Sequence, residues 1–358
     1  MARDLDRREF ESLLNEADGP SPLGTTLFDS MLGVAVRRWC APVLDLDPHA
    51  PAEAYLARRR ELGAAEVNRR FVSGTGIVEF LVDTGYQPQG LCSPDDLATM
   101  AGGTAHEIVR LERLGQEVLA AGASPDDFAG ALESRLRSTG AVAAKSIAAY
   151  RTGLQLPAAR PTAGELARAV AGVRPDRDGG YRIAHPVVNG WLAWTAIEVG
   201  LPLQLHVGYG DNDVDLRDCD PLCLTGFLRA TADRGVPVLL LHNYPFHRHA
   251  AYLAQVFDHV FMDLGLATHN AGALSPTLLR ESLELVPFGK LLFSSDAFGL
   301  GELYHLGALL FRRGLASVLG SLVAAGEMTE QDAAHLAELV CGGNARRVYR
   351  LEDPRPDR

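Results

Sequence analysis

Three apolar segments of the sequence end in side chains that can bind a metal ion. The segment LQLH ends at His206, VLLLH ends at His242 and LLFSSD ends at Asp296. A lone His after an apolar strand usually belongs to the core, and an Asp there often caps a helix, but three such residues on separate strands favour one shared divalent metal site. Imidazole and carboxylate suit Zn, Mn or Fe. A bound metal lowers the pKa of water to about 7, and Asp296 could accept its proton.

The elements that must position these residues are short apolar runs that alternate with helical patterns. This alternation predicts a parallel sheet in an α/β fold, and the expected architecture is a (β/α)8 TIM barrel, whose active site lies at the C-terminal ends of the strands. Seven runs are predicted as strands: Gly76–Asp83, Ala105–Glu112, Ala141–Tyr150, Leu201–His206, Val236–His242, His259–Asp263 and Lys290–Asp296.

The first 75 residues contain no convincing strand. Their pattern predicts helices at Arg8–Ala17, Leu27–Trp39, Pro51–Leu62 and Ala64–Phe71. We therefore expect an N-terminal helical segment (1–75) packed on a barrel (76–358), together forming one domain. Because a closed barrel needs eight strands and only seven are found, its first strand is missing from the prediction.

Other polar residues follow the predicted strands and could bind a substrate. Arg110 lies on the second predicted strand, Tyr150 ends the third, and Arg151 follows directly after it. Asp213 belongs to the GDNDVD run (210–215) after His206, which is interpreted as a substrate loop or a plain Asp-rich turn. An arginine here could pair bidentately with a substrate carboxylate.

Composition limits the class of protein. The formal net charge is -11, which argues against a nucleic-acid or anionic-membrane surface. No apolar run is expected to approach the ~20 residues of a membrane span, and the charged N-terminus has no secretory pattern. The five Cys residues form no CxxC pair. We expect a cytoplasmic protein that acts on a small molecule and could form a homo-oligomer.

Three long segments give the sequence a resemblance to a known family. They are LPLQLHVGYGDNDVDL (201–216), VLLLHNYPFHRHAAYLAQVFDHVFMDLGL (238–266) and KLLFSSDAFGLGELYHLGA (290–308), and NARRVYRL (344–351) fits the closing helix. The chain resembles the amidohydrolase superfamily, and within it the branch that is fused to glutamine-synthetase-like domains in some fungi and plants.

The resemblance implies roles for individual residues. His206 and His242 correspond to the metal histidines of the fifth and sixth barrel strands, and Asp296 corresponds to the proton-accepting aspartate of the eighth. Lys145 corresponds to a lysine that is carbamylated and bridges two metals in binuclear members, although a salt-bridged or snorkelling lysine is the simpler alternative.

The sequence departs from this family at the first strand, where relatives carry a D-x-H-x-H pattern with two metal-binding histidines. No H-x-H precedes His206, and His49 stands alone. Two explanations remain open. Either the natural chain begins earlier and carries this strand, or the protein lacks it and has a weakened or absent metal site.

These observations predict a hydrolase for a C–N bond in a small amide or γ-glutamyl-type conjugate, using a divalent metal, with zinc ahead of Mn or Fe. One alternative is a metal-dependent decarboxylase of the same barrel family. Another is a catalytically impaired barrel without the H-x-H strand that serves as a binding or regulatory subunit.

Overall fold

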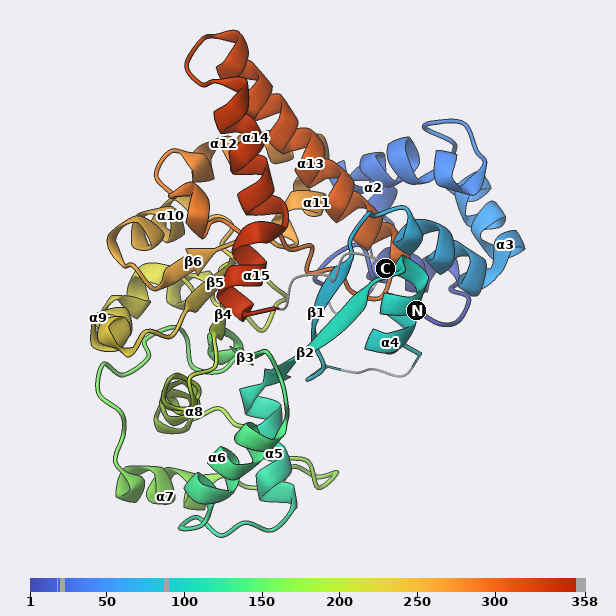
Figure 1. Ribbon diagram of the computed structural model, residues 1–358. Helices are drawn as coiled ribbons and strands as arrows, with labels where there is room; N and C mark the ends of the chain where they lie inside the picture. The colour runs from blue at the N-terminus through green and yellow to red at the C-terminus, as the bar shows by residue number, and fades with distance from the viewer. Residues whose placement is uncertain (18, 20–22, 87–89, 352–358) are drawn as a thin grey trace, which may run out of the picture.

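Six parallel strands form one curled sheet at the centre of the computed structural model, in the order β1-β2-β3-β4-β5-β6 (Figure 1). The structure describes residues 1–17, 19, 23–86 and 90–351. The strands are β1 Glu79–Asp83, β2 Thr104–Arg110, β3 Ala143–Ser146, β4 Leu203–Val207, β5 Val238–His242 and β6 Val260–Met262. Six of the seven predicted strands are thereby confirmed, and the order along the sheet is the order along the chain, as in a half-barrel.

The register of the sheet brings the predicted site residues together. Val207 pairs with His242 across β4 and β5, so His206 lies one residue away from His242 on the neighbouring strand. Arg110 pairs with Lys145 across β2 and β3. Every residue of β4 and β5 is buried, because both faces of these central strands are covered.

The seventh predicted strand, Lys290–Asp296, is wrong as a strand. Only Leu291 forms a parallel bridge, to Met262 at the end of β6, and the chain then follows an irregular path to Asp296. A complete eight-stranded barrel is therefore not formed by the described residues. They form a six-stranded parallel sheet, and Leu291 adds a single parallel bridge at its β6 edge.

Helices cover the outside of this sheet (Figure 1). Side chains cap two of them: Ser93 caps α4 in a reciprocal arrangement with Asp96, and His185 accepts a hydrogen bond from the Val187 N–H at the start of α8. The α-helices after β1 are α4 Pro94–Ala101, α5 Leu111–Ala120, α6 Phe128–Ser138, α7 Ala163–Gly172, α8 Pro186–Val199, α9 Thr225–Thr231, α10 His247–Val256, α11 Ala267–Ala271, α12 Ser275–Leu283, α13 Gly301–Ala324, α14 Glu330–Glu338 and α15 Asn344–Tyr349.

The N-terminal segment is helical, as predicted, in its described part. It comprises α1 Arg7–Ser12, α2 Met31–Ala35, a π-helical turn at Val36–Cys40 and α3 Ala52–Ser73. The two helices predicted on either side of Gly63 are confirmed: the α3 range is interrupted by a kink at Gly63, whose φ of 76° lies in the left-handed region.

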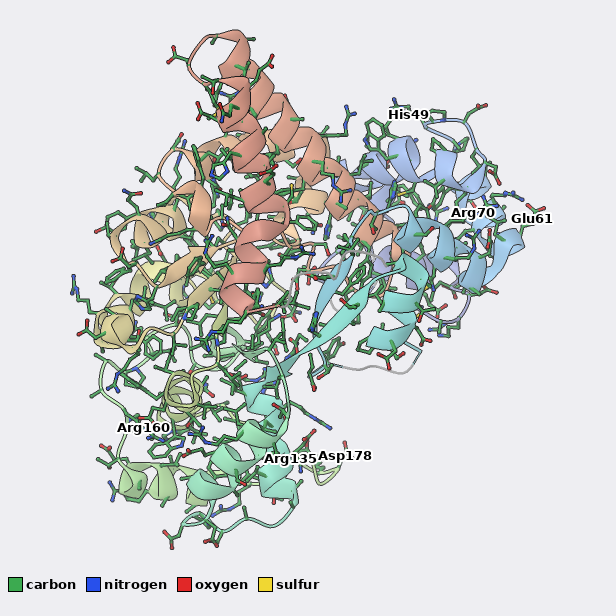
Figure 2. The ribbon with its side chains drawn as sticks, viewed as in Figure 1. His49, Glu61, Arg70, Arg135, Arg160 and Asp178 are labelled. Carbon is green, nitrogen blue, oxygen red and sulfur yellow. The ribbon has the colours of Figure 1, made fainter. Side chains whose placement is uncertain are left out.

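A separate apolar cluster joins this segment to α13. In its centre Phe10 stacks on Phe28, and the Tyr55 ring packs against both at an angle. Leu303 and Leu310 of α13 complete the cluster. Charged residues such as Glu61 and Arg70 lie on the outer side of these helices (Figure 2). The 1–75 boundary stays a prediction, since the two parts share this core.

Helix α13 is long and apolar enough to cross a membrane by length and composition, with a mean hydropathy of 1.4. The expectation that no segment approaches a membrane span is therefore wrong for this helix. Half of its most apolar 18-residue stretch is buried inside the protein, a property that core helices of globular proteins share.

Candidate active site

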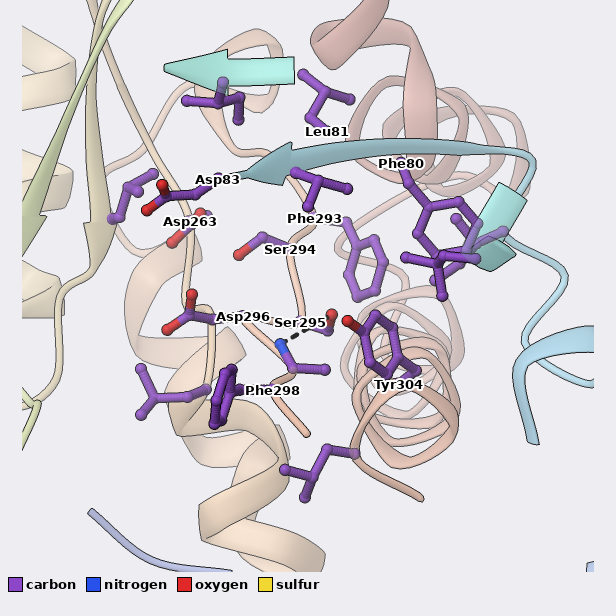
Figure 3. A pocket seen from close by; sticks show the side chains of 18 of the residues that line it. Phe80, Leu81, Asp83, Asp263, Phe293, Ser294, Ser295, Asp296, Phe298 and Tyr304 are labelled. Atoms are coloured by element: carbon purple, nitrogen blue, oxygen red, sulfur yellow. Dashed lines mark hydrogen bonds between the residues drawn. The ribbon is translucent and has the colours of Figure 1, made fainter. Parts of the chain in front are cut away.

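One large pocket opens at the C-terminal ends of the strands and has a volume of about 1880 Å³. Its wall includes β1, the segment after Leu291 and residues of the N-terminal arm such as Asn15 and Glu16. Figure 3 shows the carboxylates of Asp83, Asp263 and Asp296 around the same hollow. The position agrees with the site expected for a parallel barrel.

His206 and His242 meet at the floor of this pocket. Their ring centroids are 4.5 Å apart, and both side chains are almost completely buried. Burial lowers the pKa of each imidazole well below its usual value, and the positive charge of Lys145 adds to this effect. Both rings are therefore neutral near pH 7, the form that binds a metal.

Asp296 lies beside this histidine pair. Its Oδ2 is 3.4 Å from Nδ1 of His242. Asp296 has a φ of 47° and His242 a φ of 70°, a left-handed conformation that is strained for residues other than glycine. Such strain concentrates at functional sites, where the surrounding structure holds it.

The backbone of His242 is held by neighbours that the sequence prediction did not include. Its N–H donates to Oδ1 of Asp263 at 2.6 Å. The side chain of Asn243 donates to the carbonyls of Leu240 and Asp263, at 2.6 and 2.9 Å. Burial raises the pKa of Asp263 to about 7. These hydrogen bonds hold the backbone after β5 in the conformation that directs the imidazole of His242 into the pocket.

Lys145 and Arg110 converge on Asp83, the last residue of β1. The Arg110 guanidinium forms a two-pronged contact with this carboxylate, and Nζ of Lys145 lies 3.4 Å from Oδ2. Coulombic attraction to Lys145 and Arg110 outweighs burial and lowers the pKa of Asp83. Arg110 is thus engaged within the protein, and Lys145 takes the salt-bridged alternative; its role as a metal ligand stays a prediction.

Tyr150 and Arg151 lie on the other side of the histidines. The Tyr150 ring centroid is 4.5 Å from that of His206. A Cβ on Gly210 would come within 2.2 Å of the Tyr150 hydroxyl, so this loop closes on the site only because residue 210 is glycine. Asp213 follows in the same loop and contacts Arg182 and Arg151.

Four further pocket residues were not predicted. Asp83 and Asp263 end the predicted strands 76–83 and 259–263, so the strand-end pattern that found His206 could have found them as well. His269 is buried in α11, and burial lowers its pKa to about 4. Glu16 comes from the N-terminal arm, and burial together with the charges of Asp296 and Asp211 raises its pKa to about 7. No local pattern marks the last two.

The donors at the centre of the site fit a divalent metal by type. Nε2 of His206 and both ring nitrogens of His242 are buried without a hydrogen-bond partner in the described part of the chain. An unpaired buried polar atom is costly, which is why such atoms indicate a bound ion or ligand. Within residues 1–17, 19, 23–86 and 90–351, however, no three His, Cys, Asp or Glu side chains form a complete metal-binding group.

Comparisons with known proteins agree with this geometry. A curated relative, Protein fluG of Emericella nidulans, is 30% identical over 246 residues, which are 64% of this chain and 28% of that protein. This chain therefore spans about a quarter of its relative. A solved structure from Lactobacillus casei ATCC 334, described as a metal-dependent hydrolase, is 27% identical and has a TM-score of 0.82 over 98% of this chain and 92% of that one.

A uronate isomerase from Bacillus halodurans shares the fold alone, with a TM-score of 0.57 and 13% identity over 91% of this chain and 78% of that one. Residues 110–351 match the family model described as amidohydrolase. This match covers more than half of the sequence and contains His206, His242 and Asp296. The chain belongs to the amidohydrolase family.

Proposed function

We propose that the protein hydrolyses a C–N bond, of the amide or γ-glutamyl type, in a small molecule. The observation that carries the proposal is the group of unpaired, buried imidazole nitrogens of His206 and His242 beside the carboxylate of Asp296. Neutral imidazoles next to a carboxylate suit metal-assisted hydrolysis, because they supply ligands and a proton acceptor at one point.

His206, His242 and Asp296 would hold the metal, with zinc as the first candidate. Lys145 would join them only after leaving Asp83 and losing its charge. A divalent ion supplies, when bound, a Lewis acid that acidifies a water and polarises the scissile carbonyl. The residues of the chain then have to bind the substrate, orient it and move a proton.

Asp296 is the proposed proton carrier. Its carboxylate lies at the edge of the pocket, so that Oδ2 can accept a proton from the attacking water and later give it to the leaving nitrogen. Nδ1 of His242 lies 3.4 Å from this oxygen without a hydrogen bond to it, which leaves the imidazole free to bind the metal. Tyr150, whose ring packs at an angle against His206, is placed to donate a hydrogen bond to the substrate. Arg151, which also lines the pocket, could bind a substrate carboxylate.

A panel of amides and γ-glutamyl conjugates, assayed with added zinc, manganese or iron, tests the proposal. We expect Asp296→Asn to lower kcat by ~10²–10⁴-fold, the usual contribution of a general acid–base. Asp233→Asn is the matched control, because Asp233 is exposed and does not line the pocket. Release of carbon dioxide in place of an amine would support the decarboxylase alternative and refute this proposal.

A further inference from the structure

Arg151 is a buried cation whose hydrogen-bonding groups are incompletely used. It lines the pocket after the turn Ala148–Tyr150, and its side chain is only 14% exposed. Its Nε has no hydrogen-bond partner in the described residues, and Nη1 makes only long contacts, 3.4 Å to the carbonyl of Tyr150 and 3.8 Å to Asp213. A buried guanidinium whose donors are only partly paired is costly, so this group points to an additional anion.

The charges around Arg151 strengthen this reading. Burial, and then the like charge of Arg182, lower the pKa of Arg151, while Glu112 and Asp213 oppose that shift. Arg110 is different, because its two-pronged contact with Asp83 already satisfies it. Of the two arginines predicted to bind a carboxylate, Arg151 is therefore the one whose guanidinium group can still donate hydrogen bonds to a ligand.

A carboxylate of the protein already lies next to this fork. Asp213 Oδ2 is 3.0 Å from Nη2 of Arg182 and 3.8 Å from Nη1 of Arg151. Asp213 is 55% exposed and sits on a turn closed by its own N–H, which donates to Asp211 at 2.9 Å. It is therefore an accessible loop group that could leave the arginines without disturbing the core.

We propose that Arg151 and Arg182 form a subsite for a carboxylate of the substrate, and that Asp213 occupies this subsite until the substrate displaces it. Asp213 then competes with the ligand, which differs from the direct substrate contact that the sequence suggested. The inference rests on the proposed function for the reaction and adds the substrate class: amides with a free carboxylate remote from the scissile bond. A carboxylate fits better than a phosphate, since the two guanidinium groups already share one.

Calorimetric titration of the full chain with glutarate, its neutral diamide and inorganic phosphate tests the subsite without turnover. We expect Arg151→Met to weaken glutarate binding about tenfold or more, because a charged hydrogen bond is lost. Arg151→Lys keeps the positive charge but loses the planar guanidinium, so its affinity for glutarate should lie between those of the wild type and Arg151→Met. Asp213→Asn should tighten glutarate binding. Arg217→Met is the control, since Arg217 pairs with Asp215 in the same loop and is fully open to solvent.

Equal binding of glutarate and its diamide would overturn the subsite, as would an unchanged affinity in Arg151→Lys and Arg151→Met. Weaker glutarate binding by Asp213→Asn would overturn the competing role of Asp213. Tighter binding of phosphate than of glutarate would overturn the carboxylate class. If glutarate binds as expected but no amide is cleaved, the proposed function fails while the subsite stands. If amides are cleaved but glutarate binds no more tightly than its diamide, the subsite fails while the proposed function stands.

Discussion

A buried ion pair attaches the N-terminal segment to α13 and allows a quantitative prediction. Nε of Arg59, in α3, lies 2.8 Å from Oε1 of Glu302, and the side chains are 3% and 0% exposed. The hydroxyl of Tyr55 donates to the same oxygen at 3.0 Å. Replacing Glu302 by Gln leaves the guanidinium buried without its counter-charge.

Breaking one partner of a buried pair typically costs ~3–5 kcal/mol. Because Gln keeps an acceptor for Tyr55, we expect Glu302→Gln to lower the free energy of unfolding by about 3 kcal/mol, the lower end of that range. Urea unfolding followed by circular dichroism measures it. Glu66→Gln is the control on α3, the helix that carries Arg59, since Glu66 pairs with Arg69 at the surface and little change is expected.

A double variant separates a lost charge from lost packing. In Arg59→Met/Glu302→Leu no charge stays buried, so most of the lost stability should return. An unfolding free energy of Glu302→Gln equal to that of the wild type would refute the reasoning. So would a double variant as unstable as the single one.

Three further predictions concern the site and the core. Gly265→Ala places a Cβ 2.3 Å from Nδ1 of His242 and should reduce zinc affinity in calorimetry, whereas Gly235→Ala, with a similar positive φ and open space, should not. Burial raises the pKa of Glu112. Its contribution to stability is therefore present below the unfolded pKa of about 4.3 and is lost as the pH rises through the raised folded pKa. In urea unfolding, Glu112→Gln should gain stability relative to the wild type as the pH rises above about 4.3, and a difference that does not change with pH would contradict this. Phe227→Ala, at a fully buried ring, should cost ~3–5 kcal/mol in the same assay, and a loss below 1 kcal/mol would contradict its core position.

The sequence was sufficient to predict the strands that are buried on both faces. Runs such as VLLLH at 238–242 have no other stable environment than the middle of a parallel sheet. The strand prediction failed at 290–296, which also begins with an apolar run, because the chain leaves the sheet after Leu291 and no local pattern encodes that departure.

The site shows the same division. His206, His242 and Asp296 were predicted because polar residues at the ends of apolar strands are unusual, and they do come together. Glu16 could not be predicted, since it reaches the pocket only through the packing of the N-terminal segment. The left-handed backbone at His242 and Asp296 was equally hidden, because neither residue is a glycine.

The central claim is that His206, His242 and Asp296 hold a divalent metal on which hydrolysis depends. The most direct test measures bound metal and amide hydrolysis together, in the wild type and in His206→Ala and His242→Ala, after dialysis against zinc. The account predicts bound zinc and activity in the wild type and the loss of both in each variant. Wild-type protein without bound metal, together with full activity in His206→Ala, would contradict it.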